Sequence, residues 1–263
     1  MGMYAITGGS KGIGEKTVEI LKDQGHEVIC IARENADINA DIGTKEGRKL
    51  IIDKVHEICS DGLDGLICNA GVALLPKYES SYVVSVNYFG TVAIAEGLHD
   101  LLKMKSGNCT ITVSGSLAYP LNGKYFIDGL LNNCGDEERI CRLVNSLDRN
   151  VIGMALYVST KIALARWVRR VSASWAAGGV TINALAPGPV DTTIMGVKMV
   201  PNNENTGFFQ PLPVLNGKNR VIDPIEVAHT LAFLVSPGAK CINGSIVFCD
   251  AGTEAVLNTE KFY

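Results

Sequence analysis

Short apolar runs alternate along the chain with longer segments in which apolar residues recur every three or four positions. Runs of the first kind are typical of buried strands, and segments of the second kind are typical of amphipathic helices. The predicted strands cover residues 3–6, 27–31, 65–68, 109–113, 180–185 and 245–248. The predicted helices cover residues 12–24, 44–59, 80–103, the stretch around 157–161, and 224–235.

The repeated order of strand, helix and strand predicts an α/β fold. We expect a single-domain, doubly wound (Rossmann) parallel sheet with right-handed crossovers and helices on both faces. A chain of 263 residues fits one such domain, and no fixed-period repeat interrupts it. Because ligands of these sheets gather at the carboxyl ends of the strands, candidate functional residues are expected there.

Composition narrows the classes of partner. The apolar fraction is 47% and the formal net charge is only −3, so electrostatics gives no reason to expect nucleic acid or an anionic membrane. The longest charge-free stretch, residues 171–190, holds three glycines and two prolines and is not typical of a membrane span. Eight cysteines without a C-x-x-C pair favour reduced thiols, and a strand beginning near residue 3 leaves no room for a secretion signal. We expect small-molecule partners and a cytoplasmic location.

A glycine-rich turn follows the first predicted strand, with the sequence Thr-Gly-Gly-Ser-Lys-Gly-Ile-Gly at residues 7–14. Glycines there permit a tight turn, and the amide groups and positive dipole end of the following helix suit a pyrophosphate. The spacing is T-G-x-x-x-G-x-G rather than G-x-G-x-x-G. A glycine-rich turn without a ligand is the alternative, although the strand–turn–helix context favours a dinucleotide site.

Tyr157 and Lys161 lie four residues apart in a segment with helical periodicity, so both side chains project from one helix face. A phenol, with a pKa of about 10, exchanges protons poorly near neutral pH unless a nearby cation favours the phenolate. Lys161 is placed to be that cation. Taken alone, this spacing is common by chance, and an amphipathic tyrosine beside a solvated lysine is the more frequent explanation.

These motifs occur together and in order, and the chain thereby resembles the classical short-chain dehydrogenase/reductase family over its whole length. The matching residues are Thr7, Gly8, Gly12, Gly14, Asn69-Ala70-Gly71, Asn87, a serine within residues 113–118, Tyr157, Lys161, Asn183 and Pro187-Gly188. The resemblance implies an NAD(P)-dependent oxidoreductase.

The resemblance also implies the catalytic roles. Tyr157 would exchange a proton with the substrate oxygen, while Lys161 would hold the nicotinamide ribose and lower the pKa of Tyr157. A serine would steady the substrate oxygen. Ser116 fits the family spacing better than Ser114, because it is followed by one residue and then a small one, and Ser114 would then be a structural strand residue.

Asn87 falls inside a predicted helix, where asparagine is unfavourable. In the family, the equivalent asparagine distorts the helix and positions a water beside the lysine. The alternative is a polar residue that merely faces outward.

Cofactor preference follows from the end of the second strand. NAD-preferring relatives place an acid there, whereas this chain has Arg33, which suits a 2′-phosphate. Lys11 adds a second cation, and Glu34 opposes both. We therefore expect NADP(H), with NAD(H) as the alternative. The expected dinucleotide-binding residues are Gly8, Ser10, Lys11, Gly12, Ile13, Gly14, Arg33, Asp41, Ile42, Asn69, Ala70, Gly71, Tyr157, Lys161, Pro187, Gly188, Val190 and Thr192, although Asp41 could instead cap the helix that begins near Thr44.

Two segments are expected to set the substrate. An insertion at about residues 120–152, with a short extra helix at 136–147, resembles the bacterial 3α-hydroxysteroid dehydrogenase/carbonyl reductase branch. It lies where many relatives pack into tetramers, which favours a homodimer here, with a tetramer as the alternative. An apolar loop region at about 191–220 suits a flat hydrophobic substrate, or merely packs as a small lid.

The sequence therefore predicts reversible hydride transfer between a nicotinamide and a secondary hydroxyl or ketone, on a steroid or bile acid. A reductase of smaller carbonyls, such as a ketone, quinone or 3-oxoacyl compound, is the alternative within enzymes. A non-catalytic dinucleotide-binding regulator is the alternative of another class, because fold does not fix function.

Overall fold

The computed structural model describes residues 1–73, 75–118, 125–192 and 221–261. These residues form a seven-stranded sheet in the order β3-β2-β1-β4-β5-β6-β7, in which every neighbouring pair is parallel. The strands are β1 Met3–Thr7, β2 Glu27–Ala32, β3 Ile38–Asn39, β4 Gly65–Cys68, β5 Asn108–Thr112, β6 Thr181–Pro187 and β7 Ile246–Cys249. The strand order reverses between β1 and β4, which is where doubly wound sheets bind ligands.

The predicted parallel α/β sheet is confirmed. All six predicted strands are present, and their ends shift by no more than two residues. The strand that the prediction missed is β3, because two residues carry no hydrophobic periodicity.

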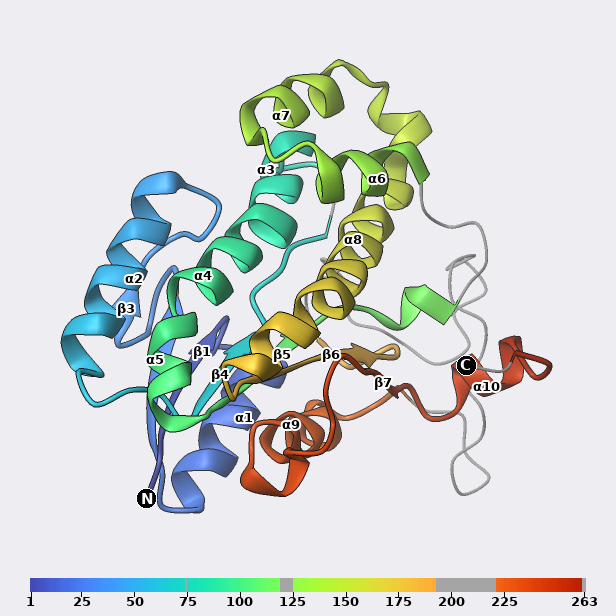
Figure 1. The fold of residues 1–263 in the computed structure, drawn as a ribbon. Coiled ribbons are helices and arrows are strands. Elements are labelled where there is room, and N and C mark those ends of the chain that lie inside the picture. The colour runs from blue at the N-terminus through green and yellow to red at the C-terminus, as the bar shows by residue number, and fades with distance from the viewer. Residues whose placement is uncertain (74, 119–124, 193–220, 262–263) are drawn as a thin grey trace.

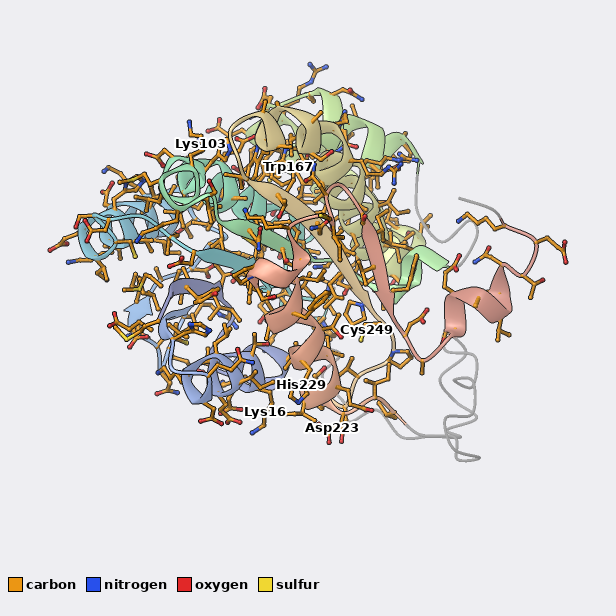
Figure 2. The ribbon with its side chains drawn as sticks, turned by 60° about the horizontal axis from the view of Figure 1, so that its bottom comes forward. Lys16, Lys103, Trp167, Asp223, His229 and Cys249 are labelled. Atoms are coloured by element: carbon orange, nitrogen blue, oxygen red, sulfur yellow. The ribbon has the colours of Figure 1, made fainter. Side chains whose placement is uncertain are left out.

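Helices cover both faces of the sheet (Figure 1). On one face, α1 Gly12–Asp23 and α9 Pro224–Leu234 lie side by side over an apolar cluster that includes Ile20 and Leu231 (Figure 2). On the other face, α2 Lys45–Ile58, α4 Thr91–Gly97, α5 His99–Lys105 and α8 Arg149–Ala177 enclose the larger apolar cluster. The remaining helices are α3 Ser80–Val84, α6 Tyr125–Asn133, α7 Glu137–Ser146 and α10 Thr253–Leu257, and the 3₁₀ turns are η2 Gly115–Ala118 and η3 Pro237–Ala239.

The helix predicted at residues 80–103 is not continuous. After α3 the backbone forms a π-helical turn, η1 Ser85–Gly90, before it returns to α-helical geometry in α4. Such turns widen a helix locally and are frequent at functional sites. Because η1 contains Asn87, the predicted helix distortion at this residue is confirmed. A second break, at Leu98 between α4 and α5, was not predicted.

The expected insertion contains two helices, α6 and α7, within the part that the structure describes. The predicted helix at 136–147 is confirmed as α7, which begins after Asp136, whose side chain accepts a hydrogen bond from the Arg139 amide at 2.9 Å. Figure 1 shows α6 and α7 together at one end of the molecule, near α3 and α8. The loop region predicted to cover the substrate falls largely on residues 193–220, which lie outside the described residues.

Among the described residues, α8 alone is long and apolar enough to cross a bilayer. In the structure, 61% of its most apolar window is buried inside the protein, as is typical of a core helix.

Candidate active site and dinucleotide cavity

A cavity of about 780 Å³ opens at the carboxyl ends of β1, β2, β4, β5 and β6, where the topology predicts a ligand. Its lining contains nearly all of the predicted dinucleotide-binding residues. These are Gly8, Ser10, Lys11, Gly12, Ile13, Arg33, Asp41, Ile42, Asn69, Ala70, Gly71, Tyr157, Lys161, Pro187, Gly188, Val190 and Thr192. Of the predicted set, Gly14 does not line the cavity.

Gly14 shapes the turn beneath the cavity instead. A Cβ atom on Gly14 would lie 2.1 Å from the carbonyl oxygen of Gly8, so no side chain fits there. Gly8 has a φ of +69°, which favours glycine. Asn69, in the loop that follows β4, holds this turn in place, because its Nδ2 atom donates a hydrogen bond to the Gly8 carbonyl at 3.3 Å. This tight backbone cradle at the start of α1 fits a pyrophosphate, and hence a dinucleotide.

The predicted pairing of Tyr157 and Lys161 on one face of α8 is present. The Lys161 Nζ atom lies 5.7 Å from the centroid of the Tyr157 ring and donates a hydrogen bond to the Thr112 carbonyl at 3.3 Å. Only 3% of Lys161 is exposed, and burial lowers its pKa to about 8. Lys161 therefore loses its proton at a lower pH than a surface lysine does.

The expectation that Lys161 lowers the pKa of Tyr157 stays a prediction. Burial raises the pKa of Tyr157, and a hydrogen bond with Ser114 only partly opposes that rise. The reason is that desolvation disfavours the phenolate more than this hydrogen bond stabilises it.

The serine beside Tyr157 is Ser114. It follows β5, lines the cavity, and shares a hydrogen bond with the Tyr157 hydroxyl, so the prediction that Ser114 is only a structural strand residue is wrong. Ser116 belongs to η2, and its side chain lies outside what the structure describes. Ser114 thus lies at the cavity beside Tyr157, and the choice of Ser116 as the serine that steadies the substrate oxygen stays a prediction.

Asn87 is fully buried in η1 and does not face outward. Its Oδ1 atom accepts a hydrogen bond from the Val72 amide at 2.8 Å, and its Nδ2 atom donates to the Val72 carbonyl at 2.9 Å. A Cβ atom added to Gly71 would lie 3.2 Å from the Lys161 Nζ atom and 3.4 Å from the Asn87 Oδ1 atom. Asn87 therefore fixes the loop against which Lys161 packs.

The Arg33 side chain is held at the β2 end of the cavity. Its guanidinium donates to the hydroxyls of Tyr82 and Tyr78, both at 3.3 Å. Lys11, in contrast, donates to Glu34 at 2.8 Å, and the two side chains are 70% and 67% exposed. Arg33 is thus positioned at the cavity, whereas Glu34 neutralises the second expected cation.

Asp41 lines the cavity and does not cap α2. Its Oδ1 atom accepts from the Gly43 amide at 2.7 Å, and its Oδ2 atom accepts from the Tyr82 hydroxyl at 2.7 Å. The N-cap of α2 is Thr44, whose hydroxyl accepts from the Gly47 amide at 3.0 Å. The alternative that Asp41 caps this helix is therefore wrong.

Sequence reasoning missed Tyr78 and Tyr82. Their rings are stacked with centroids 5.0 Å apart, and both residues line the cavity. The available signal was two tyrosines four residues apart after the predicted third strand, but nothing in that spacing indicates that they face Arg33. Gly153, which lines the cavity and kinks α8 at a φ of +36°, was also missed.

The fold and the cavity together define a dinucleotide-binding α/β protein in which a tyrosine and a buried lysine line the cavity beside a serine. Residues 3–125 match the family model described as short chain dehydrogenase, and residues 143–254 match the one described as Enoyl-(Acyl carrier protein) reductase. A 3-alpha-hydroxysteroid dehydrogenase/carbonyl reductase from Comamonas testosteroni is 31% identical, with full coverage of both chains. The chain belongs to the short-chain dehydrogenase family, whose members are oxidoreductases that bind nicotinamide dinucleotides.

Two further relatives show how broad the similarity is. The crystal structure of a 3-alpha-hydroxysteroid dehydrogenase from Pseudomonas sp. B-0831, complexed with NADH, superimposes with a TM-score of 0.87 at 34% identity. The match covers 99% of this chain and all of that one. A galactitol 2-dehydrogenase from Cereibacter sphaeroides is 26% identical over 94% of this chain and 93% of its own.

Proposed function

We propose that the protein interconverts a secondary hydroxyl and a ketone on a steroid or bile acid, with NADP(H) as the preferred dinucleotide. The observation that carries the reaction type is the hydrogen bond between Ser114 and Tyr157 in the cavity that also contains Lys161 and the glycine turn. The substrate class is supported by the two full-length hydroxysteroid dehydrogenase relatives.

In this mechanism the chain supplies orientation and proton transfer. The bound nicotinamide supplies or accepts the hydride. The Tyr157 hydroxyl donates a proton to the substrate oxygen in reduction and accepts it in oxidation, and the Ser114 hydroxyl holds that oxygen in place. Lys161 orients the ribose. Because burial raises the pKa of Tyr157, positive charge on Lys161 and near the nicotinamide must favour its phenolate during oxidation.

The proposed preference for NADP(H) rests on Arg33. Its guanidinium is oriented by two phenols at the end of β2, where a 2′-phosphate would accept paired hydrogen bonds. No acidic residue stands at that position, although Glu34 follows directly. The NADH in the Pseudomonas relative is the observation that favours the other dinucleotide.

A reductase of smaller carbonyls is a second candidate function, because similarity extends to a galactitol 2-dehydrogenase. For the protein as a whole we also propose a single domain, a homodimer and a cytoplasmic location. Described cysteines are all free thiols, as expected in a reducing compartment.

The test is nicotinamide absorbance with the purified protein and NADP⁺ or NAD⁺, against steroids and bile acids hydroxylated at positions 3, 7, 12, 17 or 20 in both configurations. Turnover at one position with NADP⁺ is the expected result. Turnover of small alcohols alone would replace the steroid proposal with the second candidate. A Tyr157→Phe control should bind the dinucleotide and lose turnover, whereas dinucleotide binding without any turnover in the parent protein would favour a regulator.

A further inference from the structure

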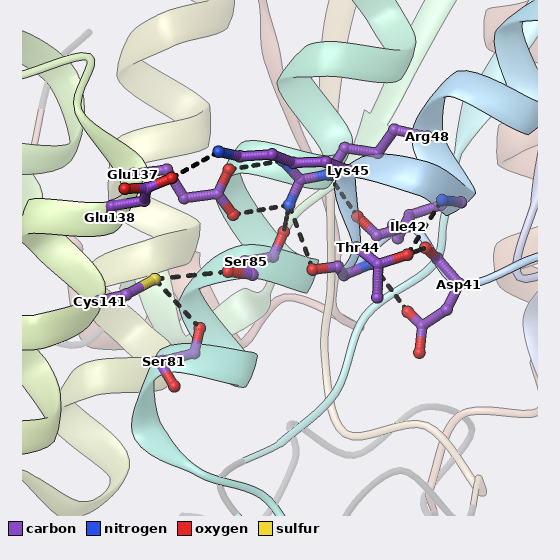
Figure 3. A network of polar contacts seen from close by, with 12 residues as sticks. Asp41, Ile42, Thr44, Lys45, Arg48, Ser81, Ser85, Glu137, Glu138 and Cys141 are labelled. Carbon is purple, nitrogen blue, oxygen red and sulfur yellow. Dashed lines mark hydrogen bonds and ion pairs between the residues drawn. The ribbon is translucent and has the colours of Figure 1, made fainter.

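Arg48, in α2, is a buried cation that lies outside the dinucleotide cavity. Only 7% of this residue is exposed, and its guanidinium reaches three separate segments (Figure 3). The Nε atom donates to the Ile42 carbonyl at 2.6 Å, and the Nη2 atom donates to the Ser85 carbonyl at 3.0 Å. The Nη1 and Nη2 atoms donate to the two carboxylate oxygens of Glu137 at 2.6 and 2.7 Å.

Glu137 is the first residue of α7, in the insertion. Burial alone would raise the pKa of its carboxyl, but hydrogen bonds from Arg48 and Ser85 and the charge of Arg48 hold it below its ordinary value. The neighbouring pair, Lys45 and Glu138, also joins α2 to α7 at 2.7 Å, but both of its side chains are 67% exposed. The two adjacent glutamates therefore differ. Glu137 makes a bidentate and largely buried ion pair with Arg48, whereas Glu138 makes an exposed pair with Lys45.

The segment that Arg48 contacts is a wall of the dinucleotide cavity. Asp41 and Ile42 line the cavity, whereas neither Arg48 nor Glu137 does. The backbone around Ile42 is packed closely, because a Cβ atom on Gly90 would lie 2.4 Å from the Ile42 carbonyl oxygen and one on Gly47 would lie 2.1 Å from the Asp41 carbonyl oxygen. The residues that pack against the outer side of this wall, Gly47, Arg48 and Gly90, therefore set its position, and Arg48 is the charged residue among them.

We propose that Arg48 and Glu137 are positioning residues for the dinucleotide, so that the insertion helix α7 holds the Asp41–Ile42 wall from behind. Glu137 fixes the guanidinium, and the guanidinium fixes the Ile42 carbonyl. The inference rests on the proposed function only in that the protein binds a nicotinamide dinucleotide. It does not depend on the substrate or on a preference for NADP(H).

The experiment measures dinucleotide affinity directly, without substrate. The parent protein, Glu137→Gln and Glu138→Gln are titrated with NADH and with NADPH, and binding is followed by nicotinamide fluorescence. Both variants remove one charge from the first turn of α7, so they are matched for the helix dipole. We expect Glu137→Gln to raise the Kd roughly tenfold, because a buried guanidinium that loses its partner rearranges. Glu138→Gln should stay within about twofold of the parent, as exposed pairs contribute little.

Two further readouts distinguish positioning from a general structural role. Glu137→Asp, which keeps the charge, should recover part of the lost affinity, and kcat of Glu137→Gln at saturating dinucleotide should change far less than the Kd. An unchanged Kd with a lowered Tm would overturn the inference, as would a fall in kcat as large as the rise in Kd. If Glu137→Gln fails to fold, Glu137→Asp carries the same comparison. Absence of dinucleotide binding by the parent protein would instead remove the proposed function.

Discussion

Asn87 and the backbone of Val72 form a closed pair of hydrogen bonds, one in each direction, at 2.8 and 2.9 Å. This pair links the π-helical turn η1 to the loop after β4. Gly71, the residue before Val72, packs against the Lys161 ammonium. The position of the lysine in the cavity therefore depends on an asparagine that does not itself line the cavity.

Asn87→Ala should remove both hydrogen bonds and leave the half-buried amide and carbonyl of Val72 without their present partners. We expect the free energy of unfolding to fall by about 2–4 kcal/mol, and kcat to fall at least about tenfold as the loop beside Lys161 loosens. Urea unfolding and steady-state kinetics measure the two effects. Thr160→Val is the comparison, because it removes the 3.3 Å contact with the Asn87 Nδ2 atom and a 2.6 Å hydrogen bond to the Tyr157 carbonyl but leaves both Val72 hydrogen bonds in place. An Asn87→Ala protein with normal kcat would show that η1 does not position Lys161.

Ser114→Ala should lower kcat by about 10²–10³-fold, because the variant loses the hydroxyl that shares a hydrogen bond with Tyr157. The Kd for the dinucleotide should change little. Ser116→Ala is the matched control and should retain most of the activity. The reverse order of effects would show that Ser116 is the serine that holds the substrate oxygen.

Arg33→Ala should raise the KM for NADP⁺ by about 10–100-fold and leave the KM for NAD⁺ within about threefold, since only NADP⁺ carries a 2′-phosphate. Lys11→Ala should have a smaller effect, because Lys11 pairs with Glu34 on the surface. Glu34→Gln should strengthen NADP⁺ binding by removing a negative charge beside Arg33. Equal losses with both dinucleotides in Arg33→Ala would show that this arginine does not select the 2′-phosphate.

The sheet and most of the cavity could be predicted because both depend on local patterns. Alternating strand and helix periodicity fixes a doubly wound sheet, and such a sheet brings strand ends together. The glycine turn and Asn69 each follow a strand directly and Pro187 ends one, so their place in the cavity follows from the topology alone.

The relations that could not be predicted depend on packing between distant segments. Tyr82 joins Arg33 to Asp41 across 49 and 41 residues, and Glu137 reaches Arg48 across 89 residues. No periodicity encodes such pairs. The choice between Ser114 and Ser116 is difficult for a different reason, because the point at which the backbone leaves β5 decides which hydroxyl enters the cavity.

The lowered pKa of Lys161 predicts a pH dependence of stability with a definite sign. Burial lowers this pKa from 10.5 to about 8, so between these values the folded protein binds fewer protons than the unfolded chain. The contribution of Lys161 to the free energy of unfolding therefore rises as the pH increases from about 8 to 10.5, by at most about 3 kcal/mol. Below pH 8 the charged and buried Lys161 ammonium lowers the free energy of unfolding.

Lys161→Met removes that titration while it keeps a long side chain in place. Relative to the parent protein, the variant should be most stable near pH 7, and this relative stability should fall by about 2–3 kcal/mol by pH 10.5. Urea unfolding of both proteins at several pH values measures the difference, so that other titrating groups cancel. Activity should be lost at every pH, because methionine does not supply the ammonium that the site needs. The parent protein thus keeps a functional charge that lowers its stability. A difference that does not change with pH would mean that Lys161 titrates near its ordinary pKa and is solvated rather than buried.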